Sequence, residues 1–394
     1  MVVGFALVGL AVNPPLQAAG GLLVAGGGSH DLNCDAADGH WSDAIYGWVA
    51  DRSLALGPNG GNGRVLVLDI ETDDACHAFE PGVEVGICAF FECFAGVEAD
   101  HLCARAGQAG CVEPAAAAAA LADYDAVWFR GGDQSVYVDA WAGTSLESAL
   151  FDLWRSGGTL AGTSAGAMIQ SEVTSTGTAP SWQATSDPYD ADVELTQTLF
   201  DGAQAVLPAT LVDTHFTIRA RLGRLATFIG LLSQDGGLDV LGLGVDQETA
   251  LAIEVGVAEV LGEGAVTVLH TNADTAAALA PGEAPRVGPL VYRSLTAGFR
   301  FDLASRRIVE APEAARDVEP FPVHAPFATV TVDGQATDAS LDVGAWRAED
   351  LTDPSAFYEG RLTSIAGTSA LPRTAAVSRL ETVTAERENR AGAP

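Results

Sequence analysis

A short apolar run that ends in a Gly-x-Ser-x-Gly pentapeptide constrains this chain more than any other feature. Residues 159–161 follow a pair of glycines, and the pentapeptide covers residues 162–166 with Ser164 at its centre. Residues 165–172 can then continue as a helix. The order strand, sharp turn, helix leaves the serine exposed at the carboxyl end of a strand, with a helix N-terminus behind it. This placement suits a nucleophile, because the amide of Ala165 then points at a developing oxyanion.

The rest of the N-terminal two thirds alternates between apolar strands and helical patterns. Strands are predicted at residues 22–25, 64–70, 83–91, 126–129, 209–212, 238–245 and 265–269, with a hairpin at 251–255 and 257–261. Helices are predicted at residues 41–50, 114–122, 146–155 and 218–232, and a loop at 174–188. This alternation indicates an α/β fold with a doubly wound, mainly parallel sheet and helices on both faces.

Polar side chains follow several of these strands directly. They include the segments 130–134, 213–216 and 246–248, in addition to Ser164. Ligands of open α/β sheets bind at the carboxyl ends of the strands. We therefore expect these segments to meet at one edge of the sheet.

One of the seven histidines fits the role of a base for Ser164. His215 ends a predicted core strand after the pentapeptide and is followed by a predicted helix. A single histidine at a strand end is more often structural. Hydrolysis by a serine nevertheless needs a base and an oxyanion hole, and the Gly131-Gly132 pair after another strand could supply the latter. We therefore expect His215 to act as the base.

The charge of the chain excludes several partners. The formal net charge is −32, the isoelectric point is about 4.3, and every basic residue is an arginine. Nucleic acid and anionic membranes are therefore not expected as partners. The acidity suits a solvated surface in salty surroundings, or alternatively the attraction of a cationic substrate. No Walker A loop or metal-ligand spacing occurs, and the glycines at 26–28 do not complete a dinucleotide motif, so neither cofactor nor metal is expected.

Cysteines and the N-terminal residues both point to export. All six cysteines lie between Cys34 and Cys111, which predicts two or three disulfides in an oxidising compartment, the alternative being buried free thiols. Residues 2–12 form an apolar run like the core of a secretory signal, although a basic segment before it is missing. The run is too short to span a membrane. We expect residues 1–19 to be a signal-peptide remnant and the protein to be secreted or periplasmic.

Four ordered blocks resemble the cyanophycinase branch of the S51 serine peptidases. The likeness extends roughly over residues 20–270. The blocks are Phe129-Arg130-Gly131-Gly132-Asp133-Gln134, Gly162-Thr163-Ser164-Ala165-Gly166-Ala167, the run from Asp213 to Leu225, and the run from Gly242 to Ala250. The resemblance implies a flavodoxin-like core related to class I glutamine amidotransferases. It also implies hydrolysis of cyanophycin, a polyaspartate with arginine on each β-carboxyl, to β-Asp-Arg dipeptides.

The resemblance assigns roles to individual residues. Ser164 is the implied nucleophile and His215 the implied base, with the amides of Gly132 and Ala165 as the oxyanion hole. The implied substrate-binding residues are Gln134, Asp213, Thr214, Arg219, Arg221 and Arg224. Arginine suits this work because its planar fork binds carboxylates bidentately. For Arg219 and Arg224 a solvated or salt-bridged helix face is the alternative.

Two residues depart from the family pattern. Thr214 stands where the family usually has glutamine, so contacts to the substrate are expected to differ. Gln247 stands where the family has the glutamate of its triad. An amide can orient the imidazole but cannot stabilise the imidazolium by charge, so a large loss of rate would follow. Either Gln247 supports reduced activity, or Glu248 or Asp246 is the acid, or the chain is an inactive relative. Glu248 would need a local bulge to reach the histidine.

These features predict an S51-like catalytic domain at residues 20–275 and a small β-rich extension at 276–394, with a strand at 327–332 and a helix at 374–389. The predicted function is that of a secreted serine peptidase acting on cyanophycin or β-aspartyl peptides. The alternatives are another S51 aspartyl dipeptidase and a catalytically impaired binding protein. A glutamine amidotransferase is disfavoured, because those enzymes use cysteine where this chain has Ser164. The resemblance also implies a homodimer.

Overall fold

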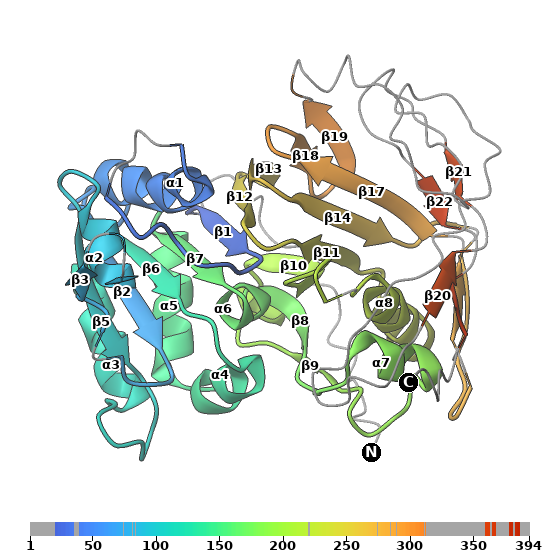
Figure 1. The fold of residues 1–394 in the computed structure, drawn as a ribbon. Coiled ribbons are helices and arrows are strands. Elements are labelled where there is room, and N and C mark those ends of the chain that lie inside the picture. The colour runs from blue at the N-terminus through green and yellow to red at the C-terminus, as the bar shows by residue number, and fades with distance from the viewer. Residues whose placement is uncertain are drawn as a thin grey trace, which may run out of the picture.

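We describe the protein from a computed structural model. It describes residues 20–312, except 35–38, 74, 81, 83, 220, 274, 284, 289 and 311, together with four short strands between residues 359 and 386. Helices and strands alternate through most of this part (Figure 1). The helices are α1 (Trp41–Ala55), α2 (Ile87–Glu92), α3 (Pro114–Ala120), α4 (Gln134–Trp141), α5 (Ser145–Arg155), α6 (Ala165–Met168), α7 (Ser181–Ser186) and α8 (Leu222–Gly236), with 3-10 turns at Leu121–Asp123 and Gly202–Gln204.

The first of two large sheets has nine strands in the order β19-β18-β13-β12-β1-β7-β6-β2-β5. Its parallel strands are β1 (Leu22–Ala25), β7 (Thr159–Thr163), β6 (Ala126–Phe129), β2 (Arg64–Asp69) and β5 (Glu98–Cys103). Its antiparallel strands are β12 (Thr249–Glu254), β13 (Val257–Gly262), β18 (Arg300–Asp302) and β19 (Arg307–Glu310).

The second large sheet has eight strands in the order β21-β22-β17-β14-β11-β10-β8-β9. Its parallel strands are β8 (Ser171–Ser175), β10 (Leu207–Asp213) and β11 (Leu241–Val245). The others are β9 (Leu195–Gln197), β14 (Ala265–His270), β17 (Leu290–Thr296), β21 (Ile365–Gly367) and β22 (Ser378–Leu380). Three further strand pairs are β3 (Phe79–Glu80) with β4 (Glu84–Val85), β15 (Ala276–Ala278) with β16 (Arg286–Gly288), and β20 (Glu359–Leu362) with β23 (Val383–Glu386).

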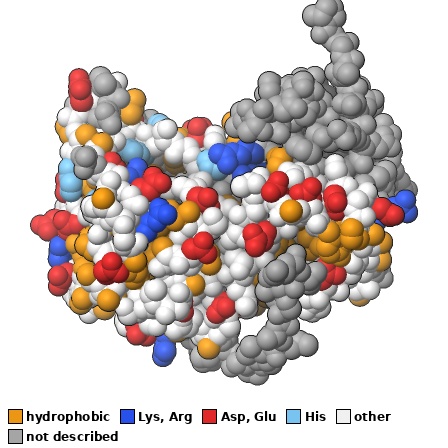
Figure 2. Space-filling view, turned by 90° about the horizontal axis from the view of Figure 1, so that it is seen from below, with side chains coloured by type: hydrophobic (Ala, Val, Ile, Leu, Met, Phe, Trp, Pro, Cys, Tyr) orange, Lys and Arg blue, Asp and Glu red, His pale blue; other side chains and the backbone are white. Residues whose placement is uncertain are grey.

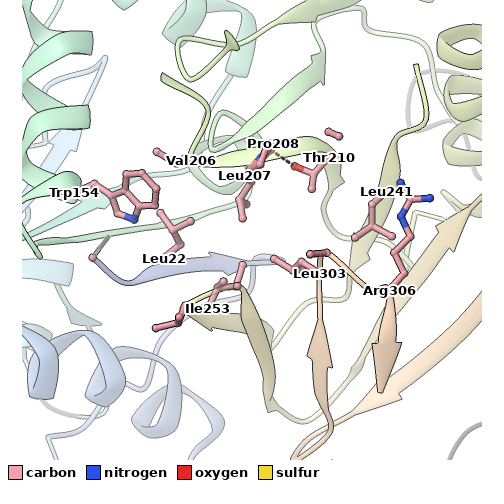
Figure 3. Close-up of a pocket in the computed structure, with 15 residues that line it drawn as sticks. Leu22, Trp154, Val206, Leu207, Pro208, Thr210, Leu241, Ile253, Leu303 and Arg306 are labelled. Atoms are coloured by element: carbon pink, nitrogen blue, oxygen red, sulfur yellow. Dashed lines mark hydrogen bonds between the residues drawn. The ribbon is translucent and has the colours of Figure 1, made fainter. Parts of the chain in front are cut away.

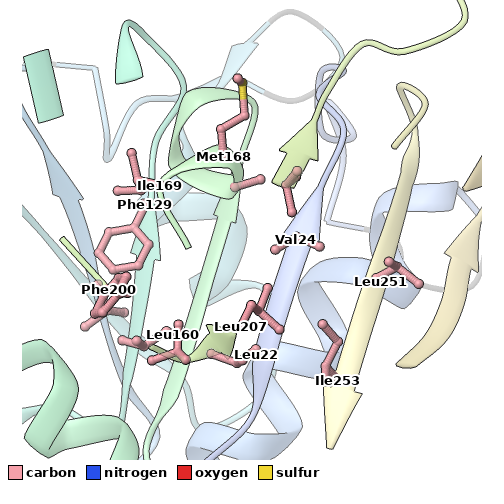
Figure 4. Packing of buried hydrophobic residues seen from close by; sticks show 14 of the residues in the cluster. Leu22, Val24, Phe129, Leu160, Met168, Ile169, Phe200, Leu207, Leu251 and Ile253 are labelled. Atoms are coloured by element: carbon pink, nitrogen blue, oxygen red, sulfur yellow. The ribbon is translucent and has the colours of Figure 1, made fainter. Parts of the chain in front are cut away.

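Strand β1 shows why helices cover both faces of the parallel sheet. Successive side chains of a strand point to opposite faces. Leu22 and Val24 therefore join one buried cluster, which includes the apolar residues of α5, while Leu23 and Ala25 join another, which includes those of α1. Figure 4 shows the first cluster between the sheet and the turn that contains α6. The predicted α/β class, with a parallel sheet between two helical layers, is confirmed.

Helix α5 illustrates how the pattern in the sequence sets the packing. Leu146, Leu150, Leu153 and Trp154 are buried. They recur at spacings of three, four or one residues, so they form one stripe along the helix. This stripe packs on the face of the sheet that carries Leu22 and Val24.

Several predicted elements differ from the structure. The apolar segment 83–91 forms helix α2 after a two-residue strand, because a buried apolar run of this length fits either state and packing decides. The helix after Ser164 ends at Met168, and β8 begins at Ser171. The loop predicted at 174–188 contains α7, and the segment 374–389 contains β22 and β23 where a helix was predicted. The strand predicted at 327–332 lies outside the described residues.

The hairpin predicted after residue 250 forms β12 and β13, and β14 follows as predicted. Beyond it, β17 pairs with β14 and β18 pairs with β13, so residues after 276 extend both large sheets. The division of the chain between residues 275 and 276 stays a prediction. Within the described residues, no helix has both the length and the apolar character required to cross a bilayer.

Three disulfides join the six cysteines, as the clustering predicted. They are Cys34–Cys93, Cys76–Cys88 and Cys103–Cys111. The first joins the loop after β1 to the end of α2, across 59 residues of sequence. The third closes a separation of only 8 residues.

Removing the first disulfide should destabilise the fold more than removing the third. Cross-links that close longer loops take more entropy from the unfolded chain, which gives about 4 kcal/mol for Cys34–Cys93 and about 2.5 kcal/mol for Cys103–Cys111. Each pair would be changed to serine and the free energy of unfolding measured with denaturant. An equal loss from both pairs would contradict this ranking.

Candidate active site

Strand register brings the predicted polar segments to one edge of the two sheets. In the first sheet Phe129 pairs with Gly162 and Ala25 pairs with Thr163. In the second, Asp213 pairs with Gly244. The carboxyl ends of β1, β6 and β7 therefore lie together, and so do those of β10 and β11.

Ser164 sits in the turn between β7 and α6 with a strained backbone. Its φ and ψ are 53° and −119°, a conformation that residues with a side chain rarely adopt. The turn requires glycine on both sides of it, because the surrounding backbone leaves no room for a side chain at either position. A Cβ on Gly162 would lie 2.6 Å from the carbonyl oxygen of Gly166, and one on Gly166 would lie 2.4 Å from that of Phe129. The pentapeptide therefore forms the strand-turn-helix elbow that its sequence predicted.

Three side chains form a hydrogen-bonded row at this edge. Ser164 Oγ lies 2.8 Å from His215 Nε2, and Gln247 Nε2 lies 2.7 Å from His215 Nδ1. The three residues come from the ends of β7, β10 and β11. The row has the geometry of a nucleophile, a base and an orienting group, with an amide in the third position.

The end of β1 and the loop after it bind the backbone of this row and of Glu248, the neighbour of Gln247. The carbonyl oxygens of Ala25, Gly26 and Gly27 accept from the amides of Ser164 (3.0 Å), His215 (2.8 Å) and Glu248 (2.8 Å), respectively. Three turns from distant parts of the sequence are thus bound to three consecutive residues.

Gly27 also leaves the space that the imidazole occupies. Its φ is 112°, and a Cβ there would lie 2.1 Å from His215 Cε1. The sequence shows three consecutive glycines here, but a turn after a strand explains them equally well. Their role at the site was therefore missed.

His215 is neutral over a wide pH range. Burial lowers its pKa, and the nearby Arg219 and Arg221 guanidiniums lower it further, to about 4. A neutral imidazole can accept a proton from the serine, whereas an imidazolium cannot.

Asp213, Arg221 and Arg224 form a buried ion cluster beside His215. Asp213 Oδ1 lies 2.8 Å from Arg221 Nη1, and Arg224 binds both carboxylate oxygens, at 2.5 and 2.7 Å. Burial raises the pKa of Asp213, but the two guanidiniums outweigh it and hold that pKa below its ordinary value. Two cations face one carboxylate, so the cluster carries one net positive charge. Arg224 and Asp213 are both buried. The contacts of Arg224 are those of a salt-bridged residue, one of the two alternatives to substrate binding that the sequence left open.

Arg219 and Thr214 differ from this cluster. Arg219 is exposed, precedes helix α8, and makes no ion pair within the described part of the chain. Thr214 is buried, and its hydroxyl has no hydrogen-bond partner there. Its carbonyl oxygen accepts from Arg221 at 2.7 Å. The helix predicted from residue 218 begins at Leu222, which leaves Arg219 on the preceding turn.

The loop between β6 and α4 lies next to the serine. A Cβ on Gly131 would be 3.4 Å from Ser164 Cβ, and Gly132 has φ 141°. Arg130 anchors the loop through an ion pair to Asp69, at 3.2 Å.

The two amides expected to form an oxyanion hole are available. Within the described residues, no hydrogen bond uses the N–H of Gly132 or Ala165. Gln134 does not point into open space, since its side-chain amide donates to the carbonyl oxygen of Ser175 at 2.5 Å. It therefore joins α4 to the end of β8.

The two other acids considered for the triad make different contacts. Asp246 accepts from the backbone amides of Thr217 (2.9 Å) and Ala265 (3.1 Å), so it fixes the turns around the site. Glu248 has φ 59°, and its side chain lies beside Gly28 and lines a neighbouring cavity. Gln247 is the residue that contacts the imidazole.

Two of the cavities among the described residues lie at opposite ends of the strands. One of about 610 Å³ lies beside Gln247 and Glu248, between the loop after β1 and the start of α1. The other, of about 180 Å³, is mostly apolar and is lined by Leu22, Leu207 and Leu241, the first residues of β1, β10 and β11 (Figure 3). It is therefore at the far end of the strands from Ser164.

Part of the positive charge of this acidic protein lies in a hollow of its surface (Figure 2). Figure 2 shows arginine side chains next to a histidine where the surface is hollowed, while acidic side chains are spread over the same face. The described residues contain no group of three or more His, Cys, Asp or Glu side chains that could hold a metal ion.

Comparison with known proteins identifies the region that carries this site. The model of peptidase family S51 matches residues 106–256, which include Ser164, His215 and Gln247. A cyanophycinase from Trichormus variabilis is 30% identical over 201 residues, which cover 49% of this chain and 62% of that protein. A cyanophycinase from Synechococcus elongatus is 34% identical over 148 residues, covering 36% of this chain and 41% of that protein. The similarity to family S51 and its cyanophycinases, indicated by the four blocks, is confirmed.

The match does not extend over whole proteins. The chain spans less than two thirds of the length of these curated relatives. Among solved structures, a peptidase from an acI-B1 Actinobacterium is 18% identical, with a TM-score of 0.44 and coverage of 72% of this chain and 97% of that one.

Gly27→Ala should slow the reaction of Ser164 with a fluorophosphonate probe by about 100-fold, because the new methyl group displaces the imidazole by an ångström or more. The measurement is the rate of labelling under excess probe. Gly143→Ala is the matched control, since Gly143 also has positive φ (71°) but nothing lies within 4 Å of a Cβ there. Equal labelling rates in the two variants would contradict the role of Gly27.

The labelling rate should also depend on pH in an unusual range. The neutral imidazole is the base, so the rate should stay high below the ordinary histidine pKa of 6.5 and fall as the pH drops through about 4. Arg219→Gln should move the midpoint upward, because it removes a charge that lowers the pKa of His215. Circular dichroism would establish that the protein is folded at each pH. A midpoint near 6.5 in the unchanged protein would refute this assignment.

Proposed function

We propose that the protein is a serine peptidase that hydrolyses cyanophycin or related β-aspartyl peptides to β-Asp-Arg dipeptides. The observation that carries the proposal is the row of Ser164, His215 and Gln247 at the strand ends, within a region that matches family S51. The relatives named cyanophycinase support the substrate class. Export is part of the proposal, and the three disulfides support it because such bonds are typical of extracellular proteins.

In the proposed mechanism Ser164 Oγ attacks the scissile carbonyl while His215 Nε2 takes its proton. The carbonyl oxygen gains negative charge, and the amides of Gly132 and Ala165 donate to it. His215 then returns the proton to the leaving amine, and water releases the acyl group from Ser164 by the reverse sequence. The net positive charge of the arginine cluster, together with the exposed Arg219, favours substrate carboxylates on that side of the site.

Gln247 determines how often His215 is in the productive tautomer. When the amide nitrogen donates to Nδ1, the ring proton is on Nε2, which then cannot accept from the serine. When the amide presents its oxygen, Nδ1–H donates to it and Nε2 is free. A glutamate would accept from Nδ1–H in every molecule and would stabilise the imidazolium by its charge. The proposal therefore includes a rate reduced by this glutamine.

The test is product analysis by mass spectrometry after incubation with cyanophycin. The protein should release β-Asp-Arg, Ser164→Ala should release none, and Gln247→Glu should raise kcat by about 10-fold or more, in line with the cost of removing a triad carboxylate.

Other outcomes would redirect the proposal. Release of dipeptides from Asp-X substrates but not from the polymer would identify another S51 aspartyl dipeptidase. Absence of hydrolysis and of fluorophosphonate labelling in both the folded protein and Gln247→Glu would refute the peptidase and favour a binding protein, the alternative that Gln247 itself motivates.

A further inference from the structure

The loop that carries the Gly132 amide is bound by a buried carboxylate on the neighbouring strand. Asp69 is the last residue of β2, which pairs with β6, and it is 4% exposed. Its Oδ2 accepts from Arg130 Nη1 at 3.2 Å, and its Oδ1 accepts from the backbone amide of Ile70 at 2.7 Å. Tyr137 OH lies 3.3 Å from the same Oδ1. One carboxylate thus contacts the residue before the two glycines of the loop and a residue of helix α4, which follows them.

Gly132 itself lies against two of these partners. A Cβ on Gly132 would be 3.9 Å from Tyr137 Cε2 and 4.0 Å from Ile70 Cδ1, which are ordinary van der Waals distances. The two residues that border Gly132 are therefore the two that share Asp69 Oδ1. A displacement of either one would also displace the amide of Gly132.

Arg130 is fixed through its backbone as well as its side chain. Its carbonyl oxygen is 3.1 Å from Tyr137 OH, so the single phenol proton is shared between this oxygen and Asp69 Oδ1. A Cβ on Gly166 would lie 2.5 Å from the same carbonyl oxygen, because the elbow that carries the nucleophile packs directly on it. The position of Arg130 is therefore coupled to the position of the nucleophile.

Asp69 and Tyr137 have the protonation states that these contacts require. Burial raises the pKa of Asp69, but His101, 3.8 Å away, and Arg130 outweigh it and hold that pKa below its ordinary value. Burial raises the pKa of Tyr137 well above its ordinary value, and the charge of Asp69 raises it further. At neutral pH a carboxylate acceptor therefore faces a phenol donor.

We propose that Asp69 is a positioning residue for the oxyanion hole: through Arg130 and Tyr137 it holds the Gly132 amide where the tetrahedral oxyanion forms. This inference rests on the proposed peptidase function and adds a residue that acts through the loop. Donors in an oxyanion hole bind the transition state more strongly than the bound substrate. Displacing the loop should therefore lower kcat and leave KM unchanged, whereas a loss of stability alone would not produce this split.

The experiment compares Asp69→Asn with Asp125→Asn on a soluble oligomer of β-Asp-Arg units. Asp125 is the matched control, because it is also buried and accepts from backbone amides, but it precedes β6 and so lies at the opposite end of that strand from the loop. Asp69→Asn should lower kcat by roughly 10- to 100-fold, at most the cost of losing one oxyanion donor, with KM within about 2-fold. Asp125→Asn should keep both values within about 2-fold of the unchanged protein. Equal kcat values in the two folded variants would overturn the inference.

Tyr137→Phe is a second variant, which decides the question even if Asp69→Asn does not fold. It removes only the hydroxyl between Asp69 and the carbonyl oxygen of Arg130, and it keeps the ring beside Gly132. Its kcat should fall by about 10-fold at unchanged KM, as expected for the loss of one hydrogen bond. A kcat equal to that of the unchanged protein would also overturn the inference.

Hydrogen exchange separates this inference from the proposed function. If the unchanged protein does not hydrolyse the oligomer, the peptidase proposal fails, and exchange of the amides at residues 129–137, measured by mass spectrometry, decides whether Asp69 holds the loop. Exchange that is at least about 10-fold faster in Asp69→Asn than in Asp125→Asn would support this role. Equal exchange in the two variants would overturn it.

Discussion

The structure depends on a close approach of backbones at the end of β1. Three consecutive carbonyl oxygens there, at residues 25–27, accept the amides of Ser164, His215 and Glu248. The approach is so tight that a Cβ on Gly26 would lie 1.8 Å from a carbonyl oxygen, and one on Gly27 would enter the imidazole. Only glycine can occupy these positions, since any side chain would separate the turns that carry the nucleophile and the base.

This close approach of backbones at the end of β1 is found where the chain passes between the two sheets. The chain leaves the second sheet at β11, passes through residues 246–248, and enters the first sheet at β12. It makes the reverse change between β7 and β8, through Ser164. The reactive residues therefore lie where the chain crosses from one sheet to the other, and the loop after β1 is the element that both crossings contact.

Charged side chains also surround the site and affect the protonation of His215. A protein with a net charge of −32 places three arginines near one histidine, with the carboxylate of Asp213 among them. The arginines help to keep His215 neutral, which favours it as a base but weakens its hold on the proton it must take. A neutral Gln247 does not offset this effect, because it brings no negative charge to the imidazole.

The sequence by itself determined the α/β class, the elbow around Ser164 and the segments that meet at the strand ends, because these depend on local patterns: apolar runs, glycine turns and polar residues after strands. It did not determine whether residues 83–91 form a strand or a helix, because an apolar run of this length fits both and the tertiary packing decides between them. Nor did it decide whether residue 247 or 248 faces the histidine. The turn made that choice, because a long-range hydrogen bond from Glu248 to Gly27 holds its backbone left-handed and turns its side chain toward Gly28. Such contacts join residues more than 200 positions apart, and only the tertiary structure brings them together.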